Sequence, residues 1–137
     1  MAYDVTVTMR PVPQKRHRHC AGGTRTYDPS AAEKATFLAL VREQGPVPLQ
    51  EGPLRAVLHF RYKRPKSHLR AGGQLRKGAP EAHVARPDVD NLAKFVLDAL
   101  QGVCYKDDSQ IVHLEVTKAY GGEDSVSLTL GRPQGTI

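Results

Sequence analysis

The strongest constraint on this fold is a segment near the middle of the chain, residues 54–62, in which one face is wholly apolar. Its apolar side chains recur at every second position, the repeat with which a β-strand directs side chains to one face. They are Leu54, Ala56, Leu58, Phe60 and Tyr62. A strand with one apolar face has to be covered by a second layer of secondary structure, so this segment predicts a sheet that is packed on one side.

Three further segments show strand patterns. Tyr3–Met9 alternates apolar and polar residues, and Ile111–Tyr120 and Ser125–Leu130 are rich in β-branched and apolar residues. The glycine-containing connection between the last two, residues 121–124, predicts that they form a hairpin. A chain of 137 residues can bury one core but not two, so we expect a single domain over residues 1–137.

The first predicted helix begins at Asp28-Pro29-Ser30 and runs to about Glu43, before Gly45-Pro46. Asp28 or Ser30 can cap it, and Ser30 with Glu33 matches a capping box. The residues stacked at helical spacing along its expected apolar face are Ala35, Leu38, Ala39 and Arg42.

The second predicted helix spans Asp88–Gln101 and ends at Gly102. Its apolar stripe consists of Leu92, Phe95, Val96, Ala99 and Leu100. The resulting order is strand, helix, strand, basic loop, helix, strand, strand. This order predicts an α+β fold in which two helices pack on one small mixed β-sheet.

Positive charge is segregated along the chain, whose net charge is +6. Residues 5–27 contain five Lys or Arg and no acid, and residues 55–86 contain nine and one acid, Glu81, which leaves −7 on the rest. Solvated loops would explain one basic run, but two runs poor in acids favour a nucleic-acid partner.

Two long loops carry most of these basic residues. Residues 10–26 and 63–87 contain prolines and glycines but no sustained apolar period, and loops of this length are usually functional or disordered. Tyr27 and Tyr62 could stack on bases, although core packing is the expected role of both. The candidates for phosphate contacts are Lys15, Arg16, Arg18, Arg25, Lys63, Arg64, Lys66, Arg70, Arg76, Lys77 and Arg86.

Carboxylates gather around the start of the second helix and before the strand that follows it. Asp88 could be a helix cap, Asp90 could pair with Lys94 four residues later, and Asp107-Asp108 could be an ordinary solvated turn. If these acids converge, however, their mutual repulsion is relieved by a cation. A hard ion such as Mg²⁺ suits oxygen ligands, and Lys94 could then contact the attacked phosphate or orient a water molecule.

Three motifs occur in a specific order along the second half of the chain. They are Asp88-Val89-Asp90-Asn91-Leu92-x-Lys94, Asp98-Ala99-Leu100 and Lys106-Asp107-Asp108-Ser109-Gln110-Ile111. Together they resemble the RusA family of Holliday junction resolvases. The similarity is densest over residues 86–116 and extends to the N-terminal strand, the first basic loop and Arg64-Pro65-Lys66-Ser67-His68.

The resemblance implies a small α+β subunit that acts as a homodimer on four-way DNA junctions with Mg²⁺, which Mn²⁺ can replace. It implies Asp88, Asp90 and Asp108 as metal ligands and Lys94 as the catalytic lysine. The distance from the helix to the acidic pair varies among relatives, so Asp107 stays an alternative to Asp108. Two symmetrical cuts across a junction also require two acid clusters, which a two-fold dimer supplies.

The predicted function is therefore a structure-selective DNA endonuclease that resolves Holliday junctions by Mg²⁺-dependent phosphodiester hydrolysis in DNA recombination and repair. One alternative is a non-catalytic protein that binds branched DNA, in which the acids only cap and turn. Another is a nuclease that acts on flaps or on RNA.

Other classes of protein and site are disfavoured. No apolar run approaches the roughly 20 residues of a membrane span, and residues 1–10 lack a signal-peptide core, so we expect a cytoplasmic protein without a small-molecule cofactor. His17, His19 and Cys20 have no second ligand pair at zinc-finger spacing. Cys104 is expected to be a small buried residue rather than a nucleophile.

Overall fold

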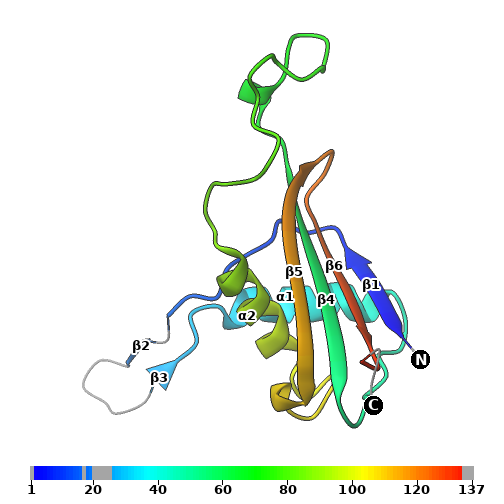
Figure 1. Cartoon of the computed structure of the whole chain (residues 1–137). Coiled ribbons are helices and arrows are strands. Elements are labelled where there is room, and N and C mark those ends of the chain that lie inside the picture. The colour runs from blue at the N-terminus through cyan, green and yellow to red at the C-terminus, as the bar shows by residue number, and fades with distance from the viewer. Residues whose placement is uncertain (1, 17, 20–25, 134–137) are drawn as a thin grey trace.

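The computed structural model describes residues 2–16, 18–19 and 26–133. Four strands form the main sheet in the order β1-β6-β4-β5, and two helices cover one of its faces (Figure 1). The predicted α+β architecture is confirmed. The strands are β1 (Tyr3–Val7), β4 (Leu54–Lys63), β5 (Ile111–Gly121) and β6 (Ser125–Gly131), and the helices are α1 (Ala31–Glu43) and α2 (Val89–Leu100). The short elements are β2 (Arg18–His19), β3 (Thr26–Tyr27), and the 3-10 turns η1 (Lys66–His68) and η2 (Asp108–Gln110).

The central strand is β4, as its long apolar face requires. It pairs antiparallel with β6 on one side and parallel with β5 on the other. All five alternating side chains of the predicted face, from Leu54 to Tyr62, are buried. The opposite face of the sheet carries polar pairs such as Arg55 with Glu115 and His59 with Thr117, so the core lies between the sheet and the helices.

The predicted hairpin between the last two strands is wrong, because β4 lies between β5 and β6. The connection passes over the end of β4, where the Lys63 amide donates to the Asp124 carboxylate at 2.8 Å. A second bond joins the Arg64 amide to the Gly121 carbonyl oxygen. A glycine-rich turn is compatible with either topology, and the central position lets β4 bury its apolar face along its whole length.

Helix α1 begins at Ala31, and the predicted capping box at its start is wrong. The Ser30 hydroxyl does not cap the helix but accepts from the Lys15 amide at 3.0 Å. The predicted apolar face is also wrong, since Phe37 and Val41 are the buried residues of α1. Apolar side chains surround this helix, so its period does not select one face, and the larger side chains bury the greater area. The exposed residues of the predicted face are Ala35, Ala39 and Arg42.

Helix α2 matches its prediction closely. The residues of its predicted stripe are all buried, together with Ala93. The Phe95 ring meets the Phe37 ring of α1 edge to face, with 6.2 Å between ring centroids. Gly102 follows the helix at a φ of +84°, a conformation that glycine adopts without strain.

The two basic segments project from the body (Figure 1). Residues 63–87 form a long extension beyond the end of β4 that contains η1 and an isolated bridge between Leu69 and Leu75. The segment expected to be only a loop, residues 10–26, contributes to the small β2–β3 ribbon. Tyr62 is buried as expected, but the expected core position of Tyr27 is wrong, since 45% of its surface is exposed. No helix in the described ranges has the length and apolar character of a membrane span.

Candidate functional site

The Asp88 carboxylate lies at the start of α2 but does not cap the helix. Asp88 occupies the cap position in an extended conformation, but its side chain makes no capping hydrogen bond and is exposed. The preceding segment is held from β5, where the Lys118 ammonium donates to the carbonyl oxygens of Ala85 at 2.6 Å and Pro87 at 2.9 Å. Helix capping therefore does not account for an aspartate at this position.

Acidic residues from two separate segments meet at one cavity of about 500 Å³ between α2 and β5. Asp90, Lys94 and Asp98 reach it from α2, and Asp108 reaches it from η2. Asp90 and Asp108 are 18 residues apart in sequence, so only the tertiary fold brings them to the same cavity. Asp88 is not among its lining residues. The rest of the lining is apolar and consists of Val89, Ala93, Leu97, Leu114 and Val116.

The two members of the acidic pair differ in what they do. The Asp107 carboxylate caps η2 by accepting from the Ser109 amide at 2.9 Å, and this hydrogen bond lowers its pKa. Asp108 faces the cavity, and burial together with the negative charges of Asp107 and Asp98 raises its pKa. This difference supports the choice of Asp108 over Asp107 as the functional acid.

Asp98 is a member of this acid cluster to which sequence reasoning assigned no role. Its signal was its spacing, since Asp90, Lys94 and Asp98 follow one another at four-residue intervals and share one side of the helix. The Lys34 ammonium of α1 lies 3.7 Å from the Asp98 carboxylate and also contacts Asp28. Asp98 is thus tied to α1 behind the cavity.

Asp28 anchors this connection. Burial alone would raise its pKa, but hydrogen bonds from Lys34, Ser30 and Gln14 outweigh burial and lower the pKa of Asp28 to about 2. The Gln14 amide donates to Asp28 at 2.9 Å, and its backbone N–H donates to the Asn91 carbonyl oxygen at 3.0 Å. The N-terminal basic segment is therefore fastened to both helices.

Lys94 lies between the acid-lined cavity and a second, basic cavity of about 510 Å³. Lys15 and Arg16 bring positive charge to the second cavity, and Gln14 and Asn91 complete its lining. In the described part of the chain, Lys94 forms no ion pair with Asp90, which was the structural alternative for this lysine. Lys94 is exposed, with carboxylates in the cavity on one side of it and basic residues in the cavity on the other.

The remaining candidates for phosphate contact are spread over the projecting segments. Arg64 and Arg76 make internal contacts, with Arg64 donating to the Pro80 carbonyl oxygen at 2.7 Å and Arg76 to that of Leu69 at 3.0 Å. Those with exposed side chains are Lys63, Lys66, Arg70, Lys77 and Arg86. The Arg18 side chain and Arg25 lie outside the described parts, as do His17 and Cys20, for which a zinc site was disfavoured from the sequence.

The donor chemistry of the acid cavity suits a hard divalent cation, because three carboxylates, those of Asp90, Asp98 and Asp108, line it. Within residues 2–16, 18–19 and 26–133, no group of three His, Cys, Asp or Glu side chains is arranged to hold a metal ion. The fit is thus one of ligand type. Cys104 is buried, and burial raises its pKa to about 11, so it is a protonated packing residue near neutral pH.

Comparison with known proteins bears directly on these motifs. The family model described as endodeoxyribonuclease RusA matches residues 8–130. An uncharacterized protein, YqaN, from Bacillus subtilis (strain 168) is 35% identical over 133 residues, which covers 91% of this chain and 92% of that protein. The family model's match includes α2, η2 and the basic segments.

Proposed function

Because the chain belongs to the RusA endodeoxyribonuclease family, we propose that it resolves four-way DNA junctions in recombination and repair by cutting phosphodiester bonds near the branch point. One observation carries this proposal. Asp90 and Asp108, far apart in sequence, line the same cavity as Lys94, with basic residues immediately beside it. This arrangement supports a hydrolytic centre beside a surface that binds the DNA backbone.

We propose Mg²⁺, replaceable by Mn²⁺, as the cofactor, with Asp88, Asp90 and Asp108 as its ligands. Asp98 is a further carboxylate within the same cavity, where it adds negative charge. A bound divalent ion polarises a phosphodiester and lowers the pKa of a bound water molecule. Asp88 and Asp90 are both exposed and lie two residues apart at the start of α2.

Lys94 acts on the phosphate in this proposal. Its ammonium stands between the carboxylates and the basic cavity, a position from which it stabilises negative charge that develops on the attacked phosphate. Lys15 and Arg16 bind the backbone on the other side of Lys94, which draws the strand across the lysine. The exposed basic residues of the 63–87 segment extend the phosphate contacts and offset repulsion between DNA and the acids.

We also propose that the active form is a homodimer, because the junction needs two symmetrical cuts. Strand β5 is an edge of the sheet, and unpaired edges are prone to associate. Its exposed apolar residues include Val112, 63% exposed, and Leu114, 44% exposed. This edge adjoins the acid cavity, since Leu114 lines it. Replacement of Val112 by Lys should reduce dimer mass in sedimentation, and unchanged mass would exclude this edge.

The test is cleavage of a synthetic four-way junction in Mg²⁺, in Mn²⁺ and in EDTA, with a linear duplex, a flap and an RNA duplex as competing substrates. Wild type should nick the junction in strands of like polarity only when metal is present. Asp90→Asn and Asp108→Asn should lose cutting by at least about 100-fold and retain junction binding in EDTA. Asp107→Asn is the matched control, and its activity should stay within a few-fold of wild type.

Two results would contradict this proposal. Junction binding without metal-dependent nicks would favour a non-catalytic binder, and preferential cutting of flaps or RNA would favour the other nuclease class. Metal binding is measured independently by calorimetry with Mn²⁺, and its heat should disappear in Asp90→Asn. Full activity in both Asp90→Asn and Asp108→Asn would remove the metal site.

A further inference from the structure

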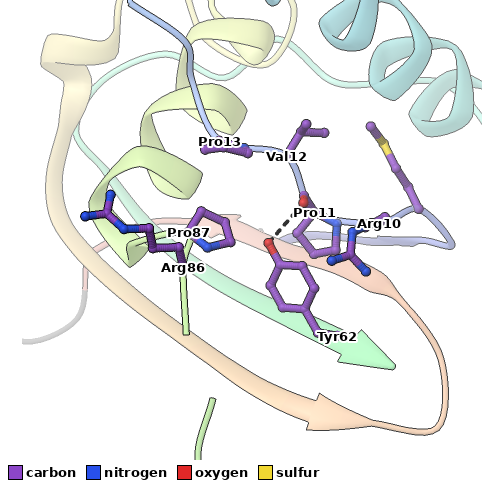
Figure 2. Close-up of a pocket in the computed structure, with 8 residues that line it drawn as sticks. Arg10, Pro11, Val12, Pro13, Tyr62, Arg86 and Pro87 are labelled. Carbon is purple, nitrogen blue, oxygen red and sulfur yellow. Dashed lines mark hydrogen bonds between the residues drawn. The ribbon is translucent and has the colours of Figure 1, made fainter. Parts of the chain in front are cut away.

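A third cavity, of about 610 Å³, lies where the N-terminal segment meets the entry to α2 (Figure 2). Pro11, Pro13 and Pro87 form rigid parts of its wall. The Tyr62 hydroxyl at the wall is already bonded, donating to the Pro11 carbonyl oxygen at 3.0 Å. The cavity thus offers a mainly apolar, pre-formed surface to an occupant.

Positive charge lies at the edge of this apolar surface. Arg10 and Arg86 both line the cavity and are exposed. The Arg10 guanidinium lies 5.1 Å from the centre of the Tyr62 ring, and this ring is also stacked on His83 with 4.5 Å between centroids. Tyr62 is therefore fixed, and the planar Arg10 cation is positioned as a stacking surface for a flat ligand.

Two residues that line this cavity are direct sequence neighbours of residues at the proposed catalytic centre or at the basic cavity beside it. Pro87 lines it, and the next residue is Asp88. Pro13 lines it, and the next residue, Gln14, lines the basic cavity beside Lys94. Neighbouring residues of the chain therefore line the apolar cavity and the basic cavity, so the two cavities adjoin.

We propose that this cavity receives one unstacked nucleobase from the branch point of the DNA, with Arg10 and Arg86 contacting the phosphates that flank it. The inference rests on the proposed function and specifies how that site selects its substrate. An apolar wall with cations at its rim matches a nucleotide, which joins a flat, weakly polar base to an anionic backbone.

The chemistry of the wall also determines what is recognised. Its side chains offer stacking and van der Waals contact, which every base satisfies, and few hydrogen-bond partners for a base edge. To unpair and unstack a base in a linear duplex costs a few kcal/mol, and the cost is smaller where base pairing is already disrupted. The cavity therefore selects for branched structure and is tolerant of sequence.

The experiment uses the full-length protein in EDTA, so that binding is measured without cutting. A four-way junction and a linear duplex carry 2-aminopurine, a base whose fluorescence rises when it leaves the stack, at each position next to the branch. Wild type should raise the fluorescence at one pair of symmetry-related positions of the junction, one for each subunit of the dimer, and at none of the duplex. Val12→Trp fills the cavity from its wall and should abolish this rise.

Affinity provides the second measurement. Val12→Trp should weaken junction binding by about 5- to 100-fold, the range for loss of one stacked base, and leave duplex binding unchanged. Leu49→Trp, at an exposed position remote from the cavity, is the matched control and should bind as wild type. A thermal melt verifies that Val12→Trp is folded.

An abasic junction tests the same contact without changing the protein. Removal of the base at the responsive position should weaken wild-type binding by the same factor and should have no effect on Val12→Trp. Absence of a fluorescence rise, or an unchanged ratio of junction to duplex affinity in Val12→Trp, would overturn the inference. Cutting in Mg²⁺ without these signals would leave the proposed function intact, and the signals without cutting would support the base site alone.

Discussion

The Asp28 anchor allows a quantitative test of how the N-terminal segment is fastened to the helices. Asp28→Asn keeps the size of the side chain but removes the charge that holds the ammonium of Lys34, whose side chain is 13% exposed. The variant also loses the charge-assisted bonds from Gln14 and Ser30. Among the described residues, Lys34 then keeps one carboxylate partner, Asp98, at 3.7 Å.

The magnitude follows from the pKa of Asp28, which folding lowers from 3.8 to about 2. At about 1.4 kcal/mol for each pKa unit, this shift corresponds to an upper limit of roughly 2.5 kcal/mol. One fifth of the Asp28 side chain is exposed, and solvent screening reduces the effect. We therefore expect Asp28→Asn to lower the free energy of unfolding by about 1–2 kcal/mol at pH 7.

The pH dependence identifies the cause. Because the folded pKa of Asp28 lies below its unfolded value, the stabilisation is complete well above pH 4 and is lost as the pH falls toward 2. Urea unfolding of wild type and variant between pH 7 and pH 2.5 should give two curves that converge at the acid end. Glu123→Gln, on the exposed β5–β6 connection, is the matched control. A difference that is constant across this range would show that loss of packing, not loss of charge, explains the variant.

Three further predictions concern other parts of the molecule. Lys118→Met removes the two hydrogen bonds that hold the Ala85 and Pro87 carbonyl oxygens before Asp88. DNA cleavage should fall about 10- to 100-fold, because Asp88 is then misplaced. An equal loss of junction binding in EDTA would indicate instead that Lys118 contacts a phosphate. Leu58→Ala, at the fully buried centre of β4, should cost about 2–5 kcal/mol of unfolding free energy, and a cost below 1 kcal/mol would contradict its core position. Burial raises the pKa of Cys104 to about 11, so at pH 8 its thiol should react with an alkylating reagent only when the protein unfolds. The rate of alkylation at Cys104 in urea should therefore equal the rate of unfolding, and rapid alkylation of the native protein at this residue would refute its burial.

The elements with strong local periodicity were predictable from sequence. The alternating face of β4 and the apolar stripe of α2 are both buried as expected, because the backbone geometry of a strand or helix determines which side chains share a face. The family relationship was equally accessible, since its motifs are continuous or nearly so in sequence. The position of Asp90 and Lys94 on one side of α2 follows from the same helical repeat.

Strand order, the buried face of α1 and the make-up of the acid cluster required the tertiary structure. The glycines at 121 and 122 are as compatible with a connection over β4 as with a hairpin, and α1 has apolar residues on all sides. The meeting of Asp108 with Asp98, and the support of Asp98 by Lys34, depend on how η2 and the two helices pack. Sequence determined the local faces because they arise from the repeat of a single segment. The convergence of segments was decided only in three dimensions, because it depends on which arrangement buries those faces together.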